Sequence, residues 1–260
     1  MAFSPDGKLL ASSGDNGSVL LWDPSKQHEH IFEKHAEVEL ISEAISSDGR
    51  MLAFKRGEGY LLWDPSGAKR PQKLFDYPGD QFRPTVIRFS RRGKLMAALD
   101  RDRGVGLWNI DDGKQVKRLT AQQSIPERME VSPSDAHIAS VDIDGGIVGW
   151  NIETGASRSK DAATSGHARS LAFSLDGKKL ASGGLEGDVH VWSADNGKLL
   201  IALKNPESNV LALAFSPDGK RLAASAGSVI VMWNVEEKTI RRSLRGHHSS
   251  VTSLAFSSNG

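Results

Sequence analysis

The 260-residue sequence carries 33 Lys and Arg against 32 Asp and Glu, so a net charge of +1 favours neither nucleic acid nor an anionic membrane as a partner. Cysteine is absent, which excludes disulfides and thiolate metal sites and fits a reducing compartment such as the cytoplasm. The longest clean apolar run, residues 210–215, is far shorter than the roughly 20 residues that span a bilayer. We therefore expect a soluble, cytoplasmic protein.

A unit of about 42 residues recurs along the whole chain, and such repeats decide the fold class. The six Trp follow one another at intervals of 41, 45, 42, 42 and 41 residues. They are Trp22, Trp63, Trp108, Trp150, Trp192 and Trp233. A turn of the Ser-Pro-Asp-Gly type recurs seven times around them. Its copies begin at Ser4, Ser47, Arg91, Ser132, Ser174, Ser216 and Ser257.

Each unit is predicted to form four short strands, which we name a to d. In the clearest copy, strand a ends at Phe173, b covers residues 180–182, c ends at Trp192 and d covers 198–203. Turn residues separate these runs, and the spaces between the turns are too short for helices. The runs that end at the six Trp are mostly apolar on both faces, which is typical of a strand between two layers. In chain order they are residues 19–22, 60–63, 105–108, 147–150, 189–192 and 229–233.

These elements together resemble the WD-repeat family of β-propellers, and the resemblance covers the whole chain. The Trp-Asp pair stands intact at residues 22–23 and 63–64, and a Gly-His pair stands in register at 246–247. Asp102 and Asp144 match the turn Asp of the family, and its strand-b Ser is matched by Ser12, Ser140 and Ser182. The family's buried His–Asp–Ser–Trp network is otherwise mostly degraded here. The resemblance implies propeller blades held more by apolar stacking than by polar networks.

The resulting fold prediction is all-β: one propeller domain over residues 1–260, with six four-stranded antiparallel blades and one extra inner strand at 251–256. The sequence leaves two alternatives for how the ring of blades is completed. The chain is an excerpt of a longer repeat array, or it closes as a six-bladed ring with 251–256 beside 8–12. Residues 2–4 and 255–257 are the same Ala-Phe-Ser element, which raises this question.

No motif of a catalytic, nucleotide or metal site occurs in the sequence. His28 and His30 share one face of an expected outer strand, where we interpret them as part of a charged, solvated edge. A propeller enzyme needs carboxylates on the inner strands, and Glu43 and Glu130 are the chief candidates there. We therefore expect no enzyme, no cofactor and no metal.

A partner site is predicted at one loop. The distance from Trp63 to the next turn Gly is 30 residues, against 27 in four other copies, and the extra length lies in the d–a loop at 75–84. This loop carries residue types that are enriched at binding interfaces. They are Tyr77, Phe82 and Arg83, and the neighbouring b–c turns add Arg56, Glu58, Arg101, Asp102 and Arg103 as a charged rim. The alternative is a longer loop whose two aromatic side chains fold onto their own blade.

The resemblance implies a non-catalytic scaffold that binds other proteins or peptides on the loop-bearing face of a propeller. One alternative is a sensor or regulatory module of a larger protein of the kinase or NTPase type, which overlaps the first hypothesis. Another is an enzyme with a site in the central channel. The sequence does not indicate an oligomeric state, and fold alone does not decide function.

Overall fold

The computed structural model describes residues 2–3, 10–13, 18–22, 29–34, 43–46, 51–56, 59–64, 72–75, 86–91, 93–100, 104–120, 124–160, 168–204, 209–257 and 259–260. Within these residues every regular element is a β-strand, as predicted. The chain divides into two compact units, Met1–Arg118 and Leu119–Gly260, and each is described by itself. The single domain over 1–260 stays a prediction. The described part holds no helix with the length and apolarity that crossing a membrane requires.

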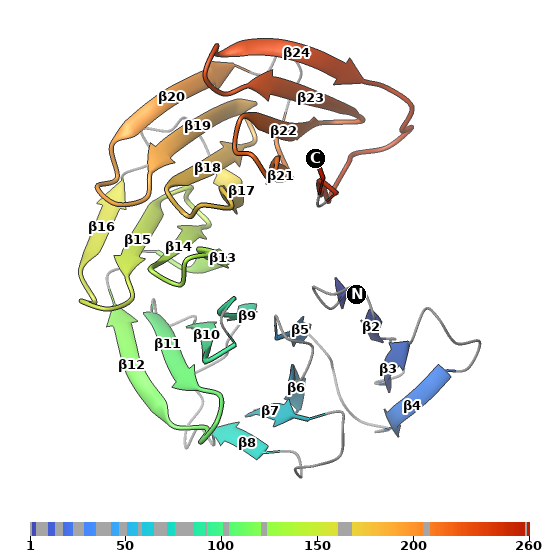
Figure 1. The fold of residues 1–260 in the computed structure, drawn as a ribbon, viewed down its shortest axis with the longest axis vertical. Helices are drawn as coiled ribbons and strands as arrows, with labels where there is room; N and C mark the ends of the chain where they lie inside the picture. The colour runs from blue at the N-terminus through green and yellow to red at the C-terminus, as the bar shows by residue number, and fades with distance from the viewer. Residues whose placement is uncertain are drawn as a thin grey trace. The chain divides into compact units, whose positions relative to one another are not determined.

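Four strands that are consecutive in the chain form each sheet, and each strand pairs with its sequence neighbour (Figure 1). Short turns suffice for such antiparallel neighbours. The described residues contain three sheets whose strands begin in the first unit. They are β1 (Ala2–Phe3), β2 (Leu10–Ser13), β3 (Ser18–Trp22) and β4 (Glu29–Lys34); β5 (Glu43–Ile45), β6 (Leu52–Arg56), β7 (Gly59–Trp63) and β8 (Gln72–Phe75); and β9 (Val86–Phe89), β10 (Leu95–Asp100), β11 (Gly104–Asn109) and β12 (Gln115–Thr120).

Three further sheets lie in the second unit, again counted over the described residues. They are β13 (Pro126–Val131), β14 (His137–Asp142), β15 (Ile147–Asn151) and β16 (Ser157–Lys160); β17 (Ala168–Phe173), β18 (Lys179–Gly184), β19 (Asp188–Ser193) and β20 (Leu199–Lys204); and β21 (Leu213–Phe215), β22 (Arg221–Ala226), β23 (Val229–Asn234) and β24 (Thr239–Leu244). The prediction that each 42-residue repeat forms four strands is therefore confirmed.

A buried serine closes the turn between the first two strands of five sheets. In the clearest copy the Lys179 N–H donates to Ser174 Oγ at 2.9 Å, and the Ser174 N–H donates to the Lys179 carbonyl at 2.9 Å. Gly177 in this turn has φ of 71°, a conformation that favours glycine. The same pair of serine contacts recurs at Ser46, Ser90, Ser132 and Ser216. The recurrent serine therefore has a structural role.

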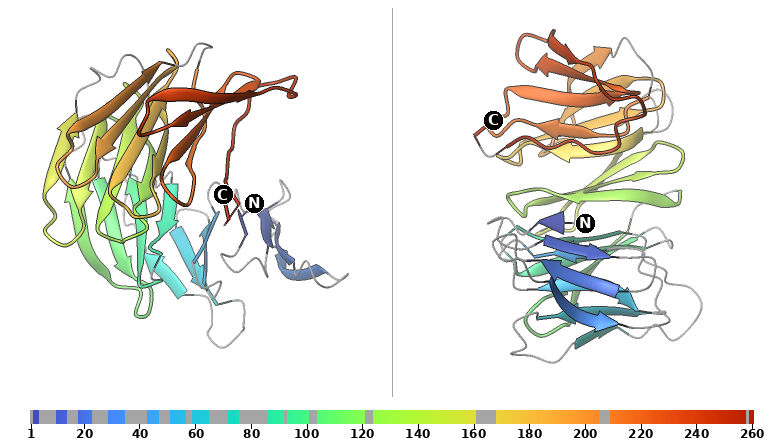
Figure 2. Two further views of the ribbon diagram at one scale, coloured as in Figure 1. Left: turned by 45° about the horizontal axis from the view of Figure 1, so that its top comes forward. Right: turned by 90° about the vertical axis from the view of Figure 1, so that its right-hand side faces the viewer.

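The sheets of the second unit pack face to face (Figure 2). Sheet β17–β20 meets sheet β13–β16 in one apolar cluster, in which Leu180 and Trp192 lie together with Ala139. Its other face packs through Val191 against Trp233 of sheet β21–β24. Trp192 and Trp233 thus each pack between two sheets, which agrees with the prediction that their strands lie between two layers.

The first unit has a core of the same kind. Trp108 on β11 packs with Ala53 and Leu62 of the preceding sheet and with Ile87 and Met96 of its own. All five side chains are at most 2% exposed. Burial of large apolar side chains between sheets contributes most of the stability of such a repeat.

The extra inner strand predicted at 251–256 is wrong, because these residues form no strand. The Val251 N–H donates to the Gly227 carbonyl at 2.9 Å, just as the Val210 N–H donates to the Gly184 carbonyl at 2.8 Å. The chain after Val210 goes on to form β21, which pairs with β22. A strand needs a neighbouring strand to pair with, and 251–256 pairs with none of the described strands.

Candidate interaction sites

Most residues predicted to bind a partner lie outside the described part of the chain. They are Tyr77, Phe82, Arg83, Glu58, Arg101, Asp102 and Arg103. Arg56 ends β6, but its side chain is not among those described. Of the two inner-strand carboxylates, Glu43 begins β5 and Glu130 lies partly buried on β13. The partner-binding role of the first eight residues stays a prediction, and so does the expectation that the two carboxylates form no catalytic site.

Three exposed apolar side chains lie at one end of the sheets β13–β16 and β17–β20. Ile143 begins the β14–β15 turn, and Leu185 begins the β18–β19 turn at the same position. Ile125 directly precedes β13, and its carbonyl accepts the Ile143 N–H at 3.0 Å. Their exposed fractions are 44% for Ile125, 41% for Ile143 and 38% for Leu185. With the exposed Asp144 and Glu186 that follow in the two turns, we call these five residues the turn surface.

Polar contacts support the turn surface. The Ser124 hydroxyl donates to Asp144, and Arg169 on β17 pairs with Glu127 on β13, which joins the inner strands of the two sheets. Beneath the turn, Asp142 is 5% exposed and accepts the Gly146 N–H at 2.7 Å. Burial raises the pKa of Asp142. The family resemblance pointed to Asp144 as the turn carboxylate, but the buried one is Asp142.

Two tryptophans of these sheets differ in their hydrogen bonds. The Trp192 indole N–H donates to Ser182 Oγ at 3.0 Å, which confirms that Ser182 is the strand-b serine of the expected network. Trp150 is 1% exposed, and its indole nitrogen has no hydrogen-bond partner among the described residues. The polar network is thus present in one sheet and incomplete in its neighbour.

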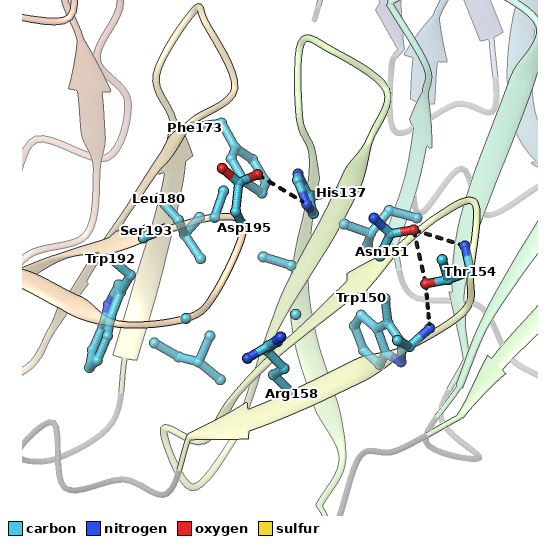
Figure 3. A pocket seen from close by; sticks show the side chains of 17 residues that line it. His137, Trp150, Asn151, Thr154, Arg158, Phe173, Leu180, Trp192, Ser193 and Asp195 are labelled. Atoms are coloured by element: carbon cyan, nitrogen blue, oxygen red, sulfur yellow. Dashed lines mark hydrogen bonds and ion pairs between the residues drawn. The ribbon is translucent and has the colours of Figure 1, made fainter.

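A pocket of about 210 Å³ opens between the same two sheets (Figure 3). It lies at the end opposite to the turn surface, beside the start of β14 and the β19–β20 turn. Ile147, Phe173 and Leu180 contribute apolar walls, and Gly149 lies among the lining residues. Within the described residues, no group of three His, Asp or Glu is placed to hold a metal ion.

Two contacts cross the mouth of the pocket to the β19–β20 turn. His137 Nε2 lies 3.7 Å from Asp195 Oδ1, and the Arg158 guanidinium donates to the Asn196 carbonyl at 3.1 Å. The His137 Nδ1 atom is buried and has no partner in the structure. Figure 3 shows Arg158 well apart from His137 and Asp195, so the mouth has two separate polar sides.

A family model described as "WD domain, G-beta repeat" matches residues 1–23, 159–193, 197–234 and 238–260. These four segments are similar to WD repeats. Residues 24–158 lie outside these matches, yet the strands described there form the same four-stranded sheets. The WD-repeat resemblance inferred from the Trp and turn spacing is therefore confirmed. The number of blades in the complete protein stays a prediction.

A curated relative is the "Protein LST8 homolog" of Drosophila melanogaster. It is 30% identical over 123 residues, which is 44% of this chain and 38% of the relative. The match thus spans less than half of the relative's length.

Sequence reasoning missed both the turn surface and the pocket. The signal for the pocket was visible, because Gly149 occupies the position directly before Trp150 where the other five repeats have a larger apolar residue. These residues are Leu21, Leu62, Leu107, Val191 and Met232. The signal for the turn surface was two large apolar residues, Ile143 and Leu185, at the first position of turns that polar residues usually fill.

Proposed function

We propose that this WD-repeat chain is a non-catalytic protein-interaction scaffold whose partner binds the turn surface. WD repeats generally bind other proteins, so the role of a protein-interaction scaffold follows from the repeats themselves. The observation that supports the turn surface is the exposure of Ile125, Ile143 and Leu185 at one end of two packed sheets. Large apolar side chains grouped on a surface are typical of interaction sites.

The charges around these side chains suggest the chemistry of the partner. Asp144 and Glu186 are exposed beside the apolar residues. A partner segment with an apolar residue flanked by Lys or Arg would be complementary to such a surface. As part of the same proposal, the chain works in the cytoplasm. The alternative of a regulatory module in a larger kinase or NTPase stays a prediction, and the flanking genomic sequence would test it.

The test is capture of partners from the source lysate with the chain as bait, quantified by mass spectrometry. The variant Ile143→Asp, Leu185→Asp should lose at least tenfold of the wild-type partners, because two apolar anchors become charged. The control is Leu199→Asp, Leu200→Asp on the outer strand β20, where the side chains are 44% and 42% exposed. It should retain those partners. Capture at the wild-type yield by a folded turn-surface variant would contradict the proposal.

A further inference from the structure

The pocket between β13–β16 and β17–β20 exists because one apolar side chain is missing. Gly149 on β15 pairs with Ala139 on β14, on the face that packs against β17–β20. A Cβ atom at Gly149 would approach only the Ile138 carbonyl oxygen, at 3.9 Å, so the backbone leaves room for a larger side chain. The glycine is therefore not required by a close approach of neighbouring atoms.

Other repeats show what this position ordinarily holds. Leu62, Leu107 and Val191 are the equivalent residues, and each is at most 2% exposed. The position directly before the tryptophan thus accommodates an aliphatic side chain. The pocket measures about 210 Å³, more than the roughly 150 Å³ cavity that holds a benzene molecule. The space is consequently large enough for an aliphatic side chain supplied from outside.

A positively charged side chain lies at the mouth of this apolar pocket. Arg158 on β16 lies directly opposite Gly149 in the strand register, and its side chain is exposed. A guanidinium has five N–H donors, and the contact to the Asn196 carbonyl engages one of its nitrogens. The remaining donors can bind a carboxylate in the paired geometry that arginine favours. Asp195 lies apart from Arg158 in Figure 3, beside His137.

We propose that this pocket binds an acidic peptide segment of a partner protein. An aliphatic side chain of the segment, Leu or Met, fills the space that Gly149 leaves, and an adjacent Asp or Glu pairs with Arg158. Ile147, Phe173 and Leu180 form the apolar walls around the aliphatic side chain. The site lies at the opposite end of the sheets from the turn surface, so its failure leaves the proposed function standing.

The experiment is an NMR titration of the ¹⁵N-labelled 260-residue chain with the peptide acetyl-Gly-Glu-Leu-Glu-Gly-amide. For a ligand of this size we expect a dissociation constant on the order of 1 mM. The shifted amides should cluster at Gly149, Asn151 and Gly197, which line the pocket. Replacing Leu with Ala in the peptide, or both Glu with Gln, should each weaken binding at least fivefold, because each removes one of the two contacts.

Two variants of the chain test the two halves of the site. Gly149→Leu restores the side chain that other repeats carry, and it should abolish peptide binding while melting no lower than the wild type. Arg158→Gln should weaken binding of the Glu peptide at least fivefold and leave the Gln peptide unchanged. The matched control is Arg242→Gln, because Arg242 lies opposite Met232 in β23–β24 as Arg158 lies opposite Gly149. It should bind like the wild type.

Three results would overturn the inference. The first is the absence of pocket shifts at the solubility limit of the peptide. The second is equal binding of the Leu and Ala peptides, and the third is equal binding of the Glu peptide by wild type and Arg158→Gln. If Gly149→Leu does not fold, the peptide series and Arg158→Gln still test the proposal. Arg158→Gln should fold, because the Arg158 side chain is exposed.

Discussion

The sheets β13–β16 and β17–β20 share their strand order, their turn serine and their tryptophan, but they differ in how the tryptophan is held. Trp192 donates to Ser182 at 3.0 Å, whereas the buried indole nitrogen of Trp150 has no partner in the structure. Both indoles are nevertheless at most 8% exposed. The ring of Trp150 is thus buried although its indole nitrogen makes no hydrogen bond. This indicates that apolar packing holds the ring more strongly than the hydrogen bond does.

The same two sheets also differ directly before the tryptophan. Val191 is fully buried against sheet β21–β24, while Gly149 at the equivalent position leaves a pocket. The backbone pairing around Gly149 is continuous from Ala139 to Arg158 despite the missing side chain. The repeat therefore tolerates a missing side chain because its ladder hydrogen bonds and its neighbours hold the strand in place.

The largest expected effect comes from removing the ring itself. Trp192→Ala should lower the free energy of unfolding by about 3–5 kcal/mol, the cost of a cavity left by a large aromatic residue. Trp150→Ala should cost about as much, since its ring is 1% exposed. Urea unfolding followed by circular dichroism measures both. The exposed Leu200→Ala is the control, with an expected change below about 0.5 kcal/mol. A loss below that level for either Trp would show that the ring is not a packing element.

A smaller effect is expected from Ser182→Ala, which leaves the indole N–H of Trp192 without its acceptor. The buried Trp192 N–H then loses its acceptor, and an unpartnered buried donor costs about 1–3 kcal/mol. The same unfolding measurement applies, with Ser159→Ala on the exposed strand β16 as the control. If Ser182→Ala is as stable as the wild type, the hydrogen bond contributes nothing beyond packing.

The smallest effect is the pH dependence of two carboxylates. The Ser174 hydroxyl donates to Asp176 at 2.6 Å and lowers the pKa of Asp176 below 3.8, so its stabilising contribution is present above that pH and is lost as the pH falls. Burial raises the pKa of Asp142 above 3.8, so the folded state binds the proton more tightly and loses stability as the pH rises.

Replacement by Asn should therefore act in opposite directions. Between pH 3 and pH 7, Asp176→Asn should reduce the gain of melting temperature on raising the pH, and Asp142→Asn should increase it. For the mostly exposed Asp176 the change should be about 0.2–1 kcal/mol, because solvent screens its interactions. Melting curves at the two pH values test the signs. A shift in the same direction for both variants would contradict the assignment of their environments.

The fold was largely predictable because its cues are local and repeated. The turn at Ser174, the run ending at Trp192 and the break at 195–197 each recur in register. In the structure, β18 follows the turn, β19 contains the run and β20 follows the break. The inner strand expected at 251–256 was wrong for a non-local reason. Its sequence resembles strand a, but a strand also needs a partner strand, and the segment pairs with none of the described strands.

The candidate site was less predictable because it depends on differences between repeats. Ile143 and Leu185 are exposed because each is the first residue of a turn, and this position is not part of the repeated sequence pattern. Gly149 was visible as a departure, but the pocket also needs the facing Phe173 and Leu180 of the next sheet. The loop at 75–84, chosen for its length and its aromatic residues, lies outside the described residues except for Phe75, which ends β8, and its role stays a prediction.

The serine-closed turn also bears on how quickly this chain folds. Ser174 and Lys179 are five residues apart, and each sheet joins strands that are neighbours in the chain. Loops of about ten residues close in roughly 10–100 ns, and proteins rich in contacts between near neighbours fold faster than those with distant pairings. Each sheet can therefore begin to form from its own segment before the sheets meet. Association of preformed neighbouring sheets would then be the slower step of folding.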